Sequence, residues 1–167
     1  MAKLKAAPVR VSWVRPEQLH FTLSFVGDVQ DREIPQLLNA VNAAVRDLET
    51  FDLMCEGVGA FPSPDNPRTV WLGVTDGAER MVALHGAVEE ALRPLGFRGE
   101  GRRYRPHLTL GRVRNTTDGA AELKTLLDHY ADYEAGVMTV AEVTIFQSDL
   151  TSGGPQYFPL GHAELKG

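Results

Sequence analysis

The chain has 167 residues, of which 43% are hydrophobic and 23% charged, an ordinary composition for a globular protein with its own core. Its formal net charge of −5 argues against broad electrostatic capture of a nucleic-acid duplex, duplex DNA included. The single Cys55 excludes an intramolecular disulfide and is expected to be a small buried hydrophobe in a reducing cytoplasm. No stretch resembles a signal peptide or a membrane span. We therefore expect a cytoplasmic monomer with no membrane partner.

Predicted strands and helices alternate along the chain. The helices show apolar residues three and four positions apart, and the strands are short apolar runs. The elements predicted in chain order are strands at 10–14 and 20–26, a helix at 31–48, strands at 51–57 and 69–74, a helix at 78–95, a strand at 104–112, a helix at 120–130, and strands at 137–147 and 156–160. Gly96 is a C-terminal stop for the second helix. The proline-rich stretch 59–67 is predicted to be a loop.

Two of the predicted strands share one pattern. Residues 19–26 read LHFTLSFV, and residues 106–113 read PHLTLGRV. Residues i and i+2 of a strand point to the same face, so His20 projects with Thr22, and His107 projects with Thr109. Two imidazoles and two hydroxyls facing one cleft supply a proton donor, a proton acceptor and neutral donors for an anion. That set suits phosphate ester chemistry without a metal.

A metal centre is the rival interpretation of the two motifs. Threonine is a poor zinc ligand, neither motif contains Asp or Glu, and the chain has no His-x-His or His-Glu-x-x-His pair. We therefore predict no metal and no cofactor. The remaining histidines, which are expected to be structural or exposed, are His85, His129 and His162.

Basic residues gather around the second motif in an otherwise acidic chain. They are Arg98, Arg102, Arg103, Arg105, Arg112 and Arg114. A basic rim of this kind favours a small or terminal anionic substrate over a long duplex, and a solvated arginine face is the alternative. Strict alternation places Arg112 on the face opposite His107, so a bulge or a strand end is needed before Arg112 reaches the same phosphate.

Three aromatic residues near the motifs could stack on a base. Trp71, inside an apolar run, is expected to belong to the core. Phe61, in the predicted loop, is the better base-stacking candidate, and Tyr104 precedes the second motif. Phe61, Tyr104 and Arg112 complete the predicted substrate-binding set.

The paired His-x-Thr motifs resemble those of the two-histidine phosphoesterases. The phrases WVRPEQLH at 13–20, PRTVWLGV at 67–74 and YRPH at 104–107 resemble the RNA 2′,3′-cyclic phosphodiesterase branch, also called 2′-5′ RNA ligases. The resemblance runs from about Val9 to the segment 148–160. Members usually open with an apolar strand and a helix. Here only residues 1–8 precede the start of the resemblance, and 2–7 resemble the end of that helix, so we expect that strand and most of that helix to be missing from the chain.

Interleaved strands and helices of these lengths indicate an α+β fold rather than a doubly wound sheet. We expect residues 1–167 to form one two-lobed domain. Each of its pseudo-symmetric lobes would be an antiparallel sheet backed by helices, and one His-x-Thr strand from each lobe would line the active-site cleft between them. The resemblance implies the same architecture.

The motif residues predict metal-independent phosphate ester chemistry, and the resemblance implies that the reaction is hydrolysis of an RNA 2′,3′-cyclic phosphate to a monoester. The residues leave open which histidine is the acid. Thr22 and Thr109 are expected to donate hydrogen bonds to the nonbridging phosphate oxygens. The resemblance implies that His20 donates the proton, that His107 accepts one, and that the product is a 2′-phosphate. It also places the family's arginine at Arg112. The reverse reaction would be 2′-5′ RNA ligation. Two alternatives stay open: a phosphodiesterase for a small cyclic or 2′,5′-linked nucleotide, and a noncatalytic module that binds RNA ends.

Overall fold

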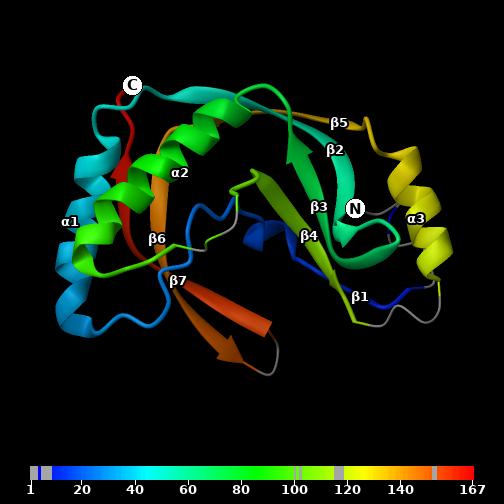
Figure 1. Cartoon of the computed structure of the whole chain (residues 1–167), viewed down its shortest axis with the longest axis horizontal. Helices are drawn as coiled ribbons and strands as arrows, with labels where there is room; N and C mark the ends of the chain where they lie inside the picture. The colour runs from blue at the N-terminus through cyan, green and yellow to red at the C-terminus, as the bar shows by residue number, and fades with distance from the viewer. Residues whose placement is uncertain (1–3, 5–8, 100, 102, 115–118, 152–153) are drawn as a thin grey trace. The chain divides into compact units, whose positions relative to one another are not determined.

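The computed structural model describes residues 4, 9–99, 101, 103–114, 119–151 and 154–167. The chain divides into two compact units, each assembled from three separate segments (Figure 1). Unit 1 comprises Met1–Thr22, Leu53–Ala78 and Pro106–Met138, and unit 2 comprises Leu23–Asp52, Glu79–Arg105 and Thr139–Gly167. The strand pairs β1–β4, β2–β3, β3–β4 and β6–β7 are antiparallel, which confirms the predicted α+β class.

A five-stranded sheet makes up most of unit 1. Its strands stand in the order β1-β4-β3-β2-β5, and their bounds are Val11–Trp13 for β1, His107–Val113 for β4, Asn66–Val74 for β3, Phe51–Ser63 for β2 and Glu134–Val140 for β5. A short 3-10 turn, η2 (Pro16–Gln18), follows β1, and one helix, α3 (Ala120–His129), belongs to the same unit.

The core of unit 1 lies between one face of this sheet and α3. Its buried members come from β2, β3, β4, α3 and the N-terminal segment, and they are Leu4, Val9, Cys55, Val58, Ala60, Val70, Leu72, Leu110, Leu123 and Leu127. Side chains that pack against this cluster include Val11, Trp13, Phe21, Leu108 and Val113. Since neighbouring residues of a regular strand point to opposite faces, the other face of the sheet bears Ser12, which lies between Val11 and Trp13, and Thr109, which lies between Leu108 and Leu110.

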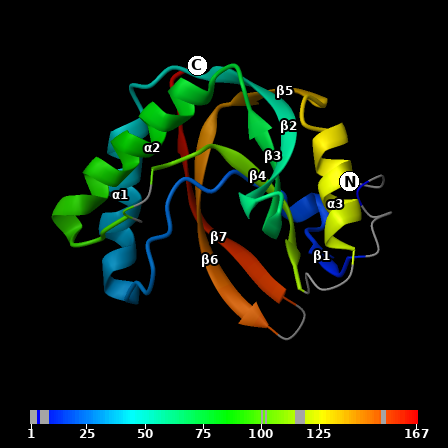
Figure 2. The ribbon, with the colours of Figure 1, turned by 45° about the vertical axis from the view of Figure 1, so that its right-hand side comes forward.

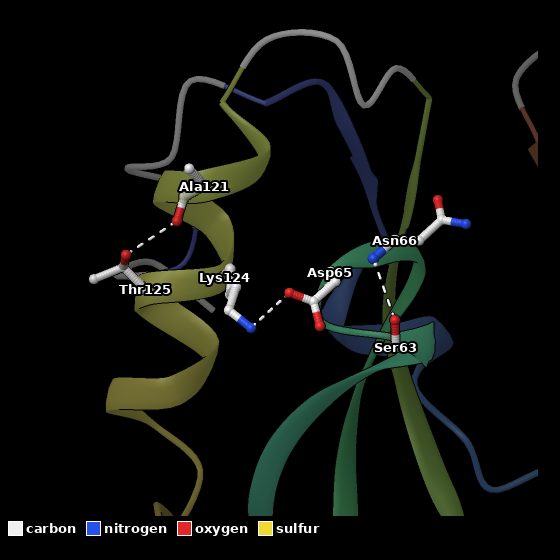
Figure 3. Close-up of polar contacts among 6 residues, drawn as sticks. All are labelled: Ser63, Asp65, Asn66, Ala121, Lys124 and Thr125. Carbon is white, nitrogen blue, oxygen red and sulfur yellow. Dashed lines mark hydrogen bonds and ion pairs between the residues drawn. The ribbon is translucent and has the colours of Figure 1, made fainter.

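The stretch 59–67 is not a loop. β2 continues to Ser63 and β3 starts at Asn66, so a tight hairpin turn joins them. The prolines are compatible with the β2–β3 hairpin because they lie at the turn and at a register shift after Phe61. A missing backbone N–H donor is tolerated at such positions. Figure 3 shows the polar contacts at the β2–β3 turn. Asn66 N–H donates to Ser63 Oγ at 3.3 Å, and Lys124 Nζ of α3 contacts Asp65 Oδ1 at 2.7 Å.

Unit 2 contains two helices and a two-stranded sheet. The helices are α1 (Ile34–Val45), which follows the 3-10 turn η3 (Asp31–Glu33), and α2 (Ala78–Leu92), which leads into η4 (Arg93–Leu95). The sheet is a long hairpin of β6 (Glu142–Thr151) and β7 (Gly154–Glu164) (Figure 2). α1 packs closely on β7, because a Cβ atom at Gly161 would lie 2.8 Å from Leu38 Cδ2.

The predicted helices at 31–48, 78–95 and 120–130 are confirmed with small changes at their ends. Gly96 has φ of 89° and ends the second one as predicted. The predicted strand 137–147 is instead two strands, β5 and β6, interrupted at Ala141. The carbonyl of Ala141 accepts a hydrogen bond from Leu165 N–H at 2.8 Å. This contact lies where the chain leaves one sheet for the other.

The predicted strand 20–26 reduces to one bridge at Phe21. From residue 23 the chain belongs to unit 2, where side chains of α2 replace a neighbouring strand as partners. His85 Nδ1 lies 2.8 Å from the carbonyl oxygen of Leu23, and Ser24 Oγ donates a short hydrogen bond to Glu89. The expected helix end at 2–7 lies outside the described residues except for buried Leu4. In the part of the chain that the structure describes, no helix is long and apolar enough to cross a membrane.

Candidate active site

The two His-x-Thr motifs meet side by side within unit 1. Phe21 forms an isolated antiparallel bridge with Leu108 of β4. Both side chains pack against the core cluster, so their neighbours along the chain project from the opposite face of the sheet. The prediction of one motif strand from each lobe is wrong, since both motifs belong to the same unit.

This bridge arranges the four polar motif residues as a quadrilateral. In the antiparallel register around it, His20 is opposite Thr109, and Thr22 is opposite His107. The two histidines therefore occupy one diagonal, and diagonal neighbours in a sheet are about 7–8 Å apart, with their Cβ atoms somewhat closer. Two imidazoles at this spacing, with a hydroxyl beside each, match the size of one phosphate group.

A backbone contact orients the first imidazole. His20 Nδ1 lies 2.8 Å from the carbonyl oxygen of Gln18. A carbonyl only accepts, so Nδ1 carries the hydrogen and donates it. In the neutral ring this contact therefore places the hydrogen on Nδ1 and leaves Nε2 as the basic nitrogen.

Aromatic rings border the second imidazole. The Phe61 ring meets His107 edge-on, with centroids 5.0 Å apart and an interplanar angle of 87°, and lies 5.2 Å from the Trp71 ring. Phe61 therefore extends from β2 beside the motif and not from a loop. Trp71 is opposite Thr109 in the β3–β4 register, so it lies on the motif face and was wrongly assigned to the core.

Glycine makes room for the Trp71 ring. A Cβ atom at Gly59, which pairs with Trp71 across β2 and β3, would lie 2.9 Å from Cε2 and closer still to Cζ2 and Cη2. A Cβ atom at Gly73 would lie 3.1 Å from Cζ3 of the same ring. In the sequence, apolar Val70 and Leu72 flank Trp71. Because both are buried in the core, strand alternation places Trp71 on the opposite, motif-bearing face.

A β-bulge brings Arg112 to the motif face. Thr109 and Gly111 of β4 face consecutive residues of β3, so Leu110 is the additional residue between them. The alternation of side chains shifts by one position at the bulge. Arg112 consequently shares a face with His107, through the kind of irregularity that the sequence analysis required.

Tyr104 belongs to unit 2, whereas the four motif residues, Phe61 and Arg112 belong to unit 1. Its ring stacks on His85 with centroids 4.2 Å apart and planes at 14°. Its hydroxyl is buried without a hydrogen-bond partner among the described residues, and burial raises the pKa of Tyr104 above its usual value. His85 is thus a packed histidine.

The remaining histidines and the basic rim are also distributed between the units. His129 ends α3 with its ring edge-on to Tyr130, and His162 of β7 lies 3.3 Å from Glu142 Oε1. Of the arginines in the basic rim, Arg98, Arg103 and Arg105 belong to unit 2, whereas Arg112 and Arg114 belong to unit 1, and Arg102 is outside the described residues. Among the described residues, no three His, Cys, Asp or Glu side chains are grouped as metal ligands would be.

An α+β fold with two adjoining His-x-Thr pairs on one sheet face is the architecture of the two-histidine phosphoesterases. The comparisons with known proteins agree. Residues 4–151 match the model of the 2′-5′ RNA ligase superfamily, and this chain belongs to that superfamily.

Curated relatives carry a more specific name. A protein of Methanothermobacter thermautotrophicus named RNA 2′,3′-cyclic phosphodiesterase is 40% identical over 154 residues, which cover 92% of this chain and 82% of the relative. Another of the same name, from Aeropyrum pernix, is 36% identical over 149 residues, covering 89% and 83%.

Solved structures share the fold. A protein of Thermus thermophilus aligns with a TM-score of 0.81 and 25% identity, over 99% of this chain and 88% of that one. E. coli LigT complexed with 3′-AMP aligns with a TM-score of 0.74 and 22% identity, over 96% and 84%.

Proposed function

We propose that this chain hydrolyses RNA 2′,3′-cyclic phosphate ends to 2′-phosphomonoesters, with no metal ion in the reaction. The observation that supports this most directly is the quadrilateral formed by His20, Thr22, His107 and Thr109 on the face of the sheet opposite the core cluster. Relatives that are 36% and 40% identical over most of their length are named RNA 2′,3′-cyclic phosphodiesterase.

The two histidines divide the proton transfers. His107, neutral, takes a proton from water as the water oxygen bonds to phosphorus. His20, protonated, gives the proton on Nε2 to the departing ribose 3′ oxygen as the P–O3′ bond breaks. The Nδ1–H bond to the carbonyl of Gln18 supports His20 in this role, because it holds the ring with Nε2 directed elsewhere. The five-membered cyclic diester is strained, so the attack needs no metal-bound hydroxide.

The threonine hydroxyls stabilise the charge that develops on phosphorus oxygens. Thr22 lies beside His107, and Thr109 lies beside His20. Each hydroxyl donates to a nonbridging oxygen, an interaction that strengthens as negative charge grows in the transition state. Arg112, on the same face after the bulge, supplies a guanidinium for the phosphate, and Phe61 supplies an aromatic surface beside the terminal nucleotide. Run backwards with a ribose 5′-hydroxyl in place of water, the same steps form a 2′-5′ bond.

Phosphorus NMR tests the reaction directly. An oligonucleotide with a 2′,3′-cyclic phosphate end is incubated with the protein and excess EDTA, beside a cyclic mononucleotide. We expect wild type to convert the cyclic phosphate to the 2′-monoester, and His20→Ala and His107→Ala to lose nearly all turnover. The matched control His162→Ala, whose ring contacts Glu142 in unit 2, should keep the wild-type rate.

Each other result points to a different function. Turnover that EDTA abolishes and zinc or manganese restores would make the histidines metal ligands. Hydrolysis of the mononucleotide alone would indicate a small-nucleotide phosphodiesterase. Tight binding of the RNA end without turnover would indicate a noncatalytic end-binding module.

A further inference from the structure

The motif face of unit 1 continues past Arg112 into a second basic group. Ser12 of β1 is opposite Arg112 of β4. One step further, Arg114 N–H donates to the carbonyl of Arg10 at 2.7 Å, which places these two arginines opposite each other. We call Arg10, Ser12 and Arg114 the outer arginine cluster.

The alternation along both strands shows which face these side chains occupy. Val11, Trp13 and Val113, which lie between them, pack against the core cluster. The outer arginine cluster therefore projects from the other face, the one that bears His107 and Arg112. Two residues of a strand span about 6.8 Å, so the Arg10–Arg114 row lies roughly that far along the strands from Arg112.

Among the residues that the structure describes, no acidic side chain neutralises the arginines of this face. Arg10, Arg112 and Arg114 are exposed, and no described carboxylate forms an ion pair with any of them. Like charges facing each other across a strand pair are destabilising, and the chain as a whole is acidic, with a net charge of −5. A local excess of guanidinium groups beside a phosphate site indicates a polyanionic ligand.

Ser12 organises the cluster. Arg114 Nε donates to Ser12 Oγ at 2.7 Å. One of the five N–H groups of a guanidinium is used in that bond, so the terminal nitrogens of Arg114 stay available for a bidentate contact with a phosphate. An arginine held in place by a neighbouring hydroxyl loses less freedom on binding than a free one.

We propose that the outer arginine cluster binds phosphodiester groups of a single RNA strand, 5′ of the cyclic phosphate end. The inference rests on the proposed function, because the strand's terminal phosphate must occupy the histidine site. A cyclic mononucleotide has no second phosphate that reaches the Arg10–Arg114 row. The cluster thus selects the end of an RNA strand over a free cyclic nucleotide.

A double variant tests the cluster. Arg10→Gln with Arg114→Gln removes two charges and keeps both side chains long. The matched control, Arg32→Gln with Arg46→Gln, removes two exposed charges from unit 2. Steady-state hydrolysis of a short cyclic-phosphate oligonucleotide and of a cyclic mononucleotide is measured over a range of salt concentrations, after thermal melts show that all variants fold.

For the oligonucleotide we expect KM to rise by roughly tenfold in the cluster variant. The slope of log(1/KM) against log salt should become shallower by about 1.4, since each lost phosphate contact on a single strand removes about 0.7. Hydrolysis of the mononucleotide should change by less than about twofold, and the control should behave as wild type.

The inference is overturned if both substrates are affected equally, or if the cluster variant matches the control on the oligonucleotide. Failure of the proposed function is a separate result, in which wild type hydrolyses neither substrate. Fluorescence anisotropy with a labelled cyclic-phosphate oligonucleotide then tests the cluster independently, with the same expected slope change. A wild type that binds no better than the cluster variant would refute it.

Discussion

A methyl group at Gly59 tests how the aromatic rings support the histidine site. Gly59→Ala adds a Cβ atom on β2 that overlaps the six-membered ring of Trp71, with Cε2 only 2.9 Å away. The φ of Gly59 is not positive, so alanine strains no backbone dihedral there. The only consequence is steric, and it must be relieved by moving the Trp71 ring.

The ring has little space in which to move. Gly73 approaches its Cζ3 from one direction, and the Phe61 ring lies 5.2 Å away on the side of His107. Overpacking of this kind costs about 1–3 kcal/mol. In a chain of this size each kcal/mol lowers Tm by about 2–4 °C, so the expected fall is about 2–12 °C. A shift of about 1 Å near reacting groups can cost about 100-fold in rate, and we expect kcat to fall by about 10- to 100-fold.

Thermal melts and cyclic-phosphate hydrolysis measure the two effects. Gly86→Ala is the matched control, since Gly86 lies in α2 and a Cβ atom there would meet nothing within 4 Å. That variant should be more stable by up to about 1 kcal/mol, because alanine favours a helix over glycine. Trp71→Phe, which removes part of the ring, should restore stability in the Gly59→Ala background. A Gly59→Ala protein with wild-type Tm and kcat would refute this account of the Trp71 ring.

Three further predictions concern the motifs and the core. Thr22→Ala and Thr109→Ala should each slow kcat by about 10- to 1,000-fold without loss of fold; two folded, fully active variants would remove the threonines from the mechanism. The rate should fall on both sides of a pH maximum, and His20→Ala combined with His107→Ala should cost little more than either change alone; additive losses would show that the histidines act separately. Burial raises the pKa of the Cys55 thiol, so less thiolate is present at pH 8 than in a free cysteine; iodoacetamide should react slowly until guanidinium unfolds the protein, and rapid native labelling would contradict this packing.

The sequence was sufficient to predict the elements whose pattern is local. The helices α1, α2 and α3 follow from apolar residues that recur on one helical face, since such a face is buried wherever the helix packs. The pairing of His20 with Thr22, and of His107 with Thr109, follows from the two-residue repeat of extended backbone. The repeated pattern itself identified the candidate catalytic residues before any tertiary contact was known.

Other features depended on contacts between distant segments. The hairpin at residues 59–67 forms because β2 finds a partner in β3, which outweighs its proline content. The strand predicted at 20–26 reduces to a bridge at Phe21, because the chain passes into unit 2 at residue 23. In both cases the partner of the backbone determined the structure, and a local pattern contains no information about that partner.

The position of Arg112 is a feature of the candidate site that the sequence alone did not predict and that strand pairing determined. By sequence alone, alternation placed it on the face opposite His107. The bulge at Leu110 reverses that assignment and aligns Arg112 with Ser12 and the outer arginine cluster. A bulge is a property of a pair of strands, defined by which residues share ladder hydrogen bonds. The residue types of the motifs were therefore determined by the sequence, and their assembly on one face was determined by strand pairing in the tertiary structure.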